Sequence, residues 1–100
     1  FQSLLTMAIQ IAQYHHERWD GKGYPRGIPG ENIPLSARIM ALADVYDALR
    51  SKRCYKEAYT HAESVKIILD GKSTQFDPCV VNAFLSGEKE FEKISLELAG

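Results

Sequence analysis

The chain has 100 residues, of which 45% are hydrophobic and 25% are charged, and its formal net charge is −1. This length suffices for one small domain, and the composition excludes a disordered chain. The near-neutral charge excludes a general attraction to DNA or to anionic membranes, so a phosphate-bearing ligand needs a local basic cluster. No apolar stretch approaches the roughly 20 residues that span a bilayer, so this segment predicts no direct membrane contact.

The two cysteines, Cys54 and Cys79, do not have the spacing of a metal-binding motif. Two thiols in a chain without a signal sequence indicate a reducing compartment, so we expect a cytoplasmic protein; a Cys54–Cys79 bridge is the alternative. The sequence begins at Phe1, inside an apolar helical pattern. We interpret it as a fragment, which leaves open an upstream membrane, sensor or receiver domain.

Hydrophobic periodicity divides the chain into helices and one long loop. Residues 1–17 carry apolar side chains on one helical face. Residues 18–36 contain seven glycines and prolines without a hydrophobic period, which predicts a loop, and loops of this length are commonly functional. Further helices are predicted over 35–50, 61–70 and 78–86, followed by an amphipathic tail.

Capping residues support two of these boundaries. Thr60 and Glu63 have the spacing of a capping box, and Asp77-Pro78 forms an N-cap and first-turn pair. No segment alternates with the period of a strand. The prediction is therefore an all-α domain of about four to five helices.

Three residues are candidate metal ligands. His15 and His16 end the first predicted helix, where they would point about 100° apart, so two neighbouring metals would take them more easily than one. Asp44 lies in the middle of an apolar helix, and an aspartate is costly to bury unless it is paired or bound to a metal. The alternatives are a hydrogen-bonded core histidine with an exposed neighbour, and a solvent-facing aspartate.

The loop DGKGYPRGIPGE, residues 20–31, offers contacts for a ligand. Gly23 permits close approach, Tyr24 offers a stacking face, and Lys22 and Arg26 are candidate phosphate partners. Beyond the aspartate helix, Arg53, Tyr55 and Lys56 suit an anionic ligand that carries bases. In isolation such features are more often an ordinary turn and a solvated charge cluster.

The order of these features resembles a known family. Residues 15–58, HHERWDGKGYPRGIPGENIPLSARIMALADVYDALRSKRCYKEA, closely resemble the signature of HD-GYP domains, and residues 71–84, GKSTQFDPCVVNAF, resemble the stretch that follows it. One departure is Cys54, where the family usually has proline. The larger departure is that no His-Asp dipeptide occurs, so residues 1–100 would be only the C-terminal portion of one HD-GYP domain, with its other ligands upstream.

The resemblance implies an α-helical hydrolase with two or three divalent metals, iron or manganese, that cleaves cyclic di-GMP to linear pGpG or GMP in bacterial signalling. His15, His16 and Asp44 match metal ligands in that family. The positions that match substrate contacts are Gly23, Tyr24, Pro25, Asp47, Arg53 and Lys56.

Three ligands are too few for two or three metals, so we expect the isolated chain to be inactive. We also expect it to self-associate through the apolar face of residues 1–12. The alternative function is a non-catalytic module whose GYP loop docks signalling partners such as diguanylate cyclases. A general HD-type nucleotide phosphohydrolase is disfavoured by the GYP loop.

Overall fold

The structure is a computed structural model that describes residues 2–52 and 57–99, the side chains of residues 2, 3 and 99 excepted. Its α-helices are α1 (Gln2–Tyr14), α2 (Leu35–Arg50), α3 (His61–Asp70), α4 (Pro78–Ser86) and α5 (Glu88–Ala99), and a short 3₁₀ helix η1 covers Gly30–Asn32. The described residues form no strand beyond one isolated bridge. The predicted all-α class and number of helices are confirmed.

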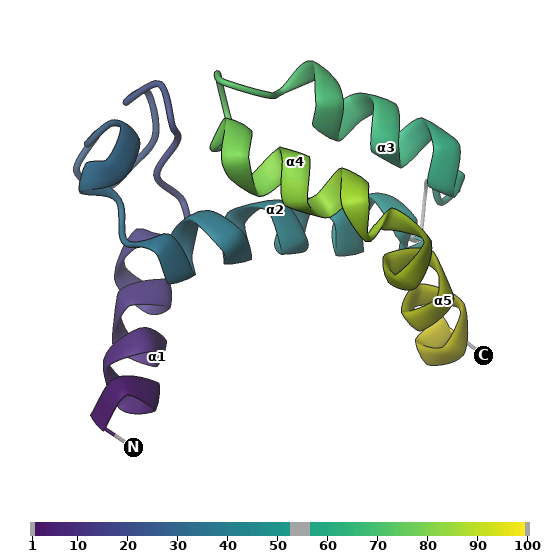
Figure 1. Cartoon of the computed structure of the whole chain (residues 1–100), viewed down its shortest axis with the longest axis horizontal. Coiled ribbons are helices and arrows are strands. Elements are labelled where there is room, and N and C mark those ends of the chain that lie inside the picture. Colours follow the sequence, from purple (N-terminus) through teal and green to yellow (C-terminus); the bar gives the residue numbers. More distant parts are fainter. Residues whose placement is uncertain (1, 53–56, 100) are drawn as a thin grey trace.

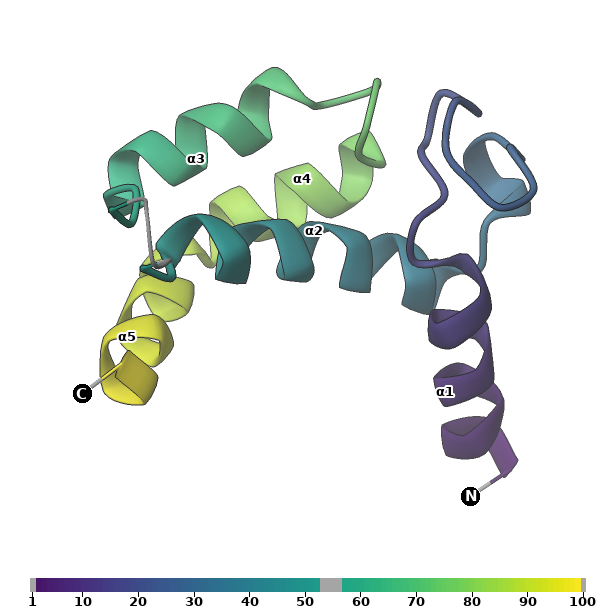
Figure 2. The same cartoon turned by 180° about the vertical axis from the view of Figure 1, so that it is seen from behind.

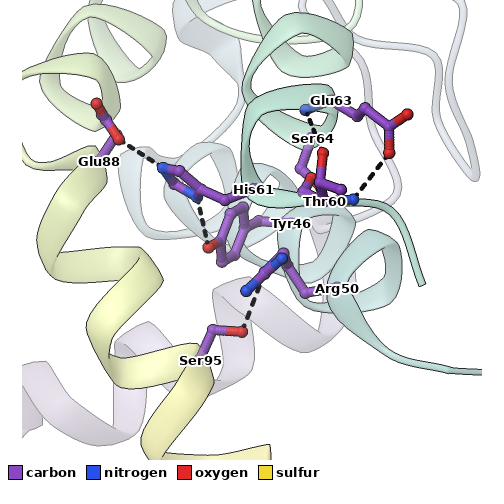
Figure 3. Close-up of polar contacts among 8 residues, drawn as sticks. All are labelled: Tyr46, Arg50, Thr60, His61, Glu63, Ser64, Glu88 and Ser95. Atoms are coloured by element: carbon purple, nitrogen blue, oxygen red, sulfur yellow. Dashed lines mark hydrogen bonds and ion pairs between the residues drawn. The ribbon is translucent and has the colours of Figure 1, made fainter.

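Local capping explains why α3 and α4 begin where the sequence predicts. The Thr60 hydroxyl accepts a hydrogen bond from the Glu63 backbone N–H, and the Glu63 carboxylate accepts one from the Thr60 N–H (Figure 3). At the start of α4, the Asp77 carboxylate accepts from the Cys79 N–H, and Pro78 occupies the first turn. These bonds satisfy backbone donors that a helix start leaves without partners.

The hydrophobic core lies between α2, α3 and α4. It consists of Leu42, Tyr46, Ile68, Phe76, Val80, Val81 and Phe84. Leu42 and Tyr46 stand one turn apart on the same face of α2, as the helical repeat requires. Removing each such side chain from water contributes about 1.5–3 kcal/mol, so this cluster holds the three helices together.

The other helices are arranged about α2, which lies at the centre of an arch-shaped molecule (Figure 1). In both views, α1 and α5 lie at opposite ends of α2 and extend to the same side of it, while α3 and α4 lie on the other side (Figures 1 and 2). The loop after α1 lies beside the turn between α3 and α4 and is joined to it by the Trp19 N–H and the Asp20 N–H, which donate to the Gln75 and Thr74 carbonyls.

The first helix ends earlier than predicted. α1 stops at Tyr14 rather than at residue 17, so His15 and His16 lie in a turn. The turn forms because the Glu17 N–H donates to the Tyr14 carbonyl, three residues back, instead of continuing the four-residue pattern. The angle predicted between two helical histidines therefore does not apply.

None of the helices among the described residues is both long and apolar enough to cross a membrane. Cys79 is exposed and its thiol is free, while Cys54 lies outside the described residues.

Candidate functional site

A pocket of about 410 Å³ lies where the turn after α1, the long loop and α2 meet. Its lining includes five of the residues that the sequence proposes for the site, namely His15, His16, Gly23, Tyr24 and Asp44. The small side chains of Ala41 and Ala48 leave room beside Asp44 on α2. The structure therefore gathers the core of the predicted site at one place.

The two histidines lie against each other at the edge of this pocket. Their ring centroids are 3.9 Å apart with the planes tilted by 41°. The His15 Nδ1 lies 2.7 Å from the Ile11 carbonyl oxygen. Because a carbonyl can only accept, Nδ1 carries the proton and the Nε2 lone pair of His15 is left for a ligand. This is the arrangement in which proteins usually present histidine to a metal.

The aspartates of α2 occupy different positions relative to the pocket. Asp44 lines it and is exposed, so its carboxylate remains accessible to solvent. The charge of Asp44 costs little free energy at this position, because water reaches the carboxylate from the side of α2 that α3 and α4 do not cover. Asp47, one turn later, is also exposed and does not line the pocket.

The loop brings Tyr24 over His16. The two rings are stacked, with centroids 4.9 Å apart and planes at 15°. Tyr24 is 62% exposed, so the tyrosine remains accessible to a ligand. Gly23 lines the pocket next to it, whereas Pro25 is exposed and lies outside the lining.

Basic side chains near the pocket differ in their partners. Lys22 and Arg18 line it. Arg18 forms an ion pair with Asp20 at 3.1 Å; the hydrogen bonds from Arg18 lower the pKa of Asp20, and Asp20 raises the pKa of Arg18. The Arg26 guanidinium instead donates to the Tyr14 hydroxyl and lies over its ring.

The predicted substrate-binding residues Arg53 and Lys56 lie outside the described residues.

Two imidazoles and a carboxylate are the donor types that iron and manganese accept, so His15, His16 and Asp44 fit a metal chemically. Within the described ranges, however, no three side chains of the histidine, cysteine and acidic types stand close enough to hold an ion. The described residues therefore do not form a complete metal site by themselves.

The sequence reasoning missed Glu17 and Gln75, which also line the pocket. Glu17 follows the histidine pair directly and is 4% exposed. Its signal in the sequence was weak, because a single acidic residue at a loop start is usually solvent-facing. Gln75 comes from the turn before α4, and only the tertiary structure brings it here.

The model of one protein family, described as an HD domain, matches residues 2–80. The chain belongs to the HD domain family. HD-domain phosphohydrolases are metal-dependent, which agrees with the donor types found in the pocket.

Relatives of this HD domain chain have names that fit the predicted resemblance. It is 54% identical over 97 residues to a probable cyclic di-GMP phosphodiesterase of Vibrio cholerae, covering 97% of this chain and 22% of the relative. It is 51% identical over 90 residues to the cyclic di-GMP phosphodiesterase response regulator RpfG of Xanthomonas campestris, covering 90% of this chain and 24% of the relative. The chain therefore spans about a fifth to a quarter of the length of these relatives.

A solved structure shares the fold. The crystal structure of a cyclic GMP-AMP specific phosphodiesterase in V. cholerae matches with a TM-score of 0.62 and 25% identity, covering 95% of this chain and 26% of that chain. Together with the relatives, this match confirms the predicted resemblance and the helical HD-type fold.

Proposed function

We propose that this chain is the C-terminal portion of an HD-GYP domain, residues 1–100, whose full domain is a metal-dependent phosphodiesterase. The proposed reaction is hydrolysis of cyclic di-GMP to linear pGpG or GMP in bacterial second-messenger signalling. The observation that carries the proposal is the pocket in which His15, His16 and Asp44 lie beside Tyr24. The names of the relatives support the substrate.

His15, His16 and Asp44 are the proposed metal ligands of this chain, in a centre of two or three divalent ions, iron or manganese. A bound metal of this kind supplies hydroxide at neutral pH and offsets charge on the phosphodiester oxygens. His15 would use Nε2, because its Nδ1 is engaged by the Ile11 carbonyl. The remaining ligands would come from sequence upstream of this chain.

The other site residues are proposed to hold the substrate. Tyr24 would stack on a guanine base, and Gly23 and Pro25 would shape the loop around it. Arg53 and Lys56 would neutralise phosphate, with Asp47 as their polar partner.

The test uses the full-length protein that contains this chain, loaded with ferrous or manganous ion. We expect turnover of cyclic di-GMP, and we expect Asp44→Asn to lower kcat at least about 100-fold, because the loss of a metal ligand weakens both metal binding and charge stabilisation. Metal content measured on the purified variants checks the same assignment without activity. Asp70→Asn, an exposed aspartate at the end of α3, is the matched control. Wild-type metal content and activity in Asp44→Asn would contradict the assignment.

The name of another relative suggests a second candidate substrate. The chain is 42% identical over 95 residues to a 3′3′-cGAMP-specific phosphodiesterase of V. cholerae. Comparing kcat/KM for cyclic di-GMP and 3′3′-cGAMP separates the two. We expect cyclic di-GMP to be preferred, because the chain is 54% identical to a probable cyclic di-GMP phosphodiesterase and 42% identical to the cGAMP-specific enzyme.

The non-catalytic alternative, in which the GYP loop docks diguanylate cyclases, is the less favoured function. Full-length protein that holds no metal yet binds a diguanylate cyclase would support it. We propose a cytoplasmic location, in line with the free thiol of Cys79.

A further inference from the structure

Glu17 is a buried carboxylate that forms no ion pair with any side chain of residues 2–52 and 57–99. It is 4% exposed. The two arginines near it in the sequence have other partners: Arg18 pairs with Asp20, and the Arg26 guanidinium donates to the Tyr14 hydroxyl. Burying a carboxylate in this way is costly unless strong hydrogen bonds compensate.

Both carboxylate oxygens of Glu17 accept hydrogen bonds from backbone N–H groups later in the loop. Oε2 accepts from the Arg26 N–H at 2.8 Å, and Oε1 accepts from the Ile28 N–H at 3.1 Å. These bonds join residues nine and eleven positions apart. The carboxylate therefore ties residues 26–28 of the loop to Glu17, near the residue at which the loop begins.

The closed loop places Tyr24 against His16. The Tyr24 N–H donates to the His16 carbonyl at 3.3 Å, and the two rings stack. Gly23 makes this approach possible, because a Cβ at that position would lie 2.5 Å from the His16 carbonyl oxygen. The stacked pair thus depends on the path of the loop. Glu17 fixes that path by its bonds to the Arg26 and Ile28 N–H groups, which follow Tyr24 in the chain.

We propose that Glu17 is a positioning residue of the candidate site: its two backbone hydrogen bonds hold the GYP loop so that Tyr24 stays stacked on His16. The proposal deepens the proposed function, in which His16 binds metal and Tyr24 binds a base. Both oxygens of Glu17 are engaged by backbone N–H groups of the loop, so Glu17 acts through the loop.

The two bonds explain why a carboxylate is needed. Glutamine has one acceptor oxygen, so its NH₂ group would face one of the two backbone N–H donors. Glu17→Gln therefore keeps the size of the side chain and removes one bond. Glu31→Gln is the matched control, because Glu31 is exposed and lies in the same connection, within η1.

The experiment is hydrogen–deuterium exchange, read by mass spectrometry, on the full-length protein and both variants. We expect exchange in the peptide covering residues 24–30 to become at least about tenfold faster in Glu17→Gln, with α2 and α4 unchanged. Glu31→Gln should match wild type. Unchanged exchange in the loop would overturn the proposal, and so would equally fast exchange in α2, because Glu17 would then support the whole fold.

Kinetics give a second readout. Because Tyr24 would contact substrate in its ground state, Glu17→Gln should raise KM about fivefold with a smaller change in kcat. An effect on kcat alone would contradict the role assigned to the loop. If the wild-type protein hydrolyses no cyclic dinucleotide, the proposed function fails, while the exchange experiment still decides whether Glu17 holds the loop.

Discussion

At the scale of single residues, the candidate site depends on short backbone distances as much as on its polar side chains. Gly23 shows this most clearly. A Cβ built on it would lie 2.5 Å from both the Arg18 nitrogen and the His16 carbonyl oxygen, and 2.7 Å from the Glu17 Cα. All three are backbone atoms, which cannot turn aside as a flexible side chain would.

Gly23→Ala should therefore displace the loop. We expect a loss of about 1–3 kcal/mol in the free energy of unfolding, since overpacking of this kind forces backbone shifts. The measurement is urea denaturation followed by the fluorescence of Trp19, the single tryptophan. Gly87→Ala is the control, because the nearest atom to a Cβ there is 4.0 Å away. Equal stabilities of the two variants would count against the close approach.

At the scale of elements, a hydrogen-bonded chain joins α2, α3 and α5. The Tyr46 hydroxyl bonds to His61 Nδ1 at 3.0 Å, and His61 Nε2 bonds to Glu88 Oε1 at 2.5 Å (Figure 3). Arg50, one turn beyond Tyr46, donates to the Ser95 hydroxyl. Together with Phe91, which packs against the core, these contacts hold α5 against the end of α2.

The burial of Tyr46 makes the stability of the fold depend on pH in the alkaline range. Burial raises the pKa of Tyr46 above its ordinary value of 10.0. A group whose pKa is raised in the folded state contributes stability below its unfolded pKa and loses it as pH rises through the folded pKa. We therefore expect the protein to lose stability above about pH 10 as the tyrosine ionises.

The test compares urea midpoints at about pH 8 and about pH 11. Tyr46→Phe should be about 1 kcal/mol less stable at the lower pH, because it lacks the bond to His61. It should lose less than wild type between the two pH values, because its ring does not ionise. Tyr24→Phe, which alters an exposed tyrosine, should keep the wild-type pH dependence; an identical dependence in Tyr46→Phe would refute the argument.

At the scale of the whole molecule, the arch leaves apolar surface uncovered. Exposed side chains occur on α1, α2 and α5, including Leu4, Leu5, Leu35, Ile39, Ile94 and Leu98. A second pocket, of about 940 Å³, lies between α2 and α4 and is lined mainly by apolar groups. Exposed apolar surface of this kind favours association with other polypeptide.

The isolated 100-residue chain should therefore self-associate in solution and show no phosphodiesterase activity. Sedimentation velocity at increasing concentration measures the first expectation. Leu4→Glu combined with Leu5→Glu should shift the chain toward monomer, because the charges replace side chains that are 68% and 65% exposed. Gln13→Glu, an exposed polar residue of the same helix, is the control. A wild-type chain that stays monomeric at every concentration would contradict the prediction, as would turnover of cyclic di-GMP by the chain alone.

The sequence by itself determined most of the helices and the residue types of the site. Helix starts at His61 and Pro78 follow from Thr60 and Asp77, because capping is a local interaction between neighbours in the chain. The family followed from the order of the histidine pair, the GYP loop and the aspartate, and the HD domain match over residues 2–80 confirms the family.

Only the tertiary structure decided how these residues meet. The burial of Glu17 depends on contacts between segments distant in the sequence, and Asp44 is exposed because no distant segment covers it. Glu17 is buried because loop amides nine and eleven residues later fold back onto it, and no periodic pattern encodes that return. The local sequence supplies the functional groups of the pocket, while the path of the loop places Tyr24 on His16.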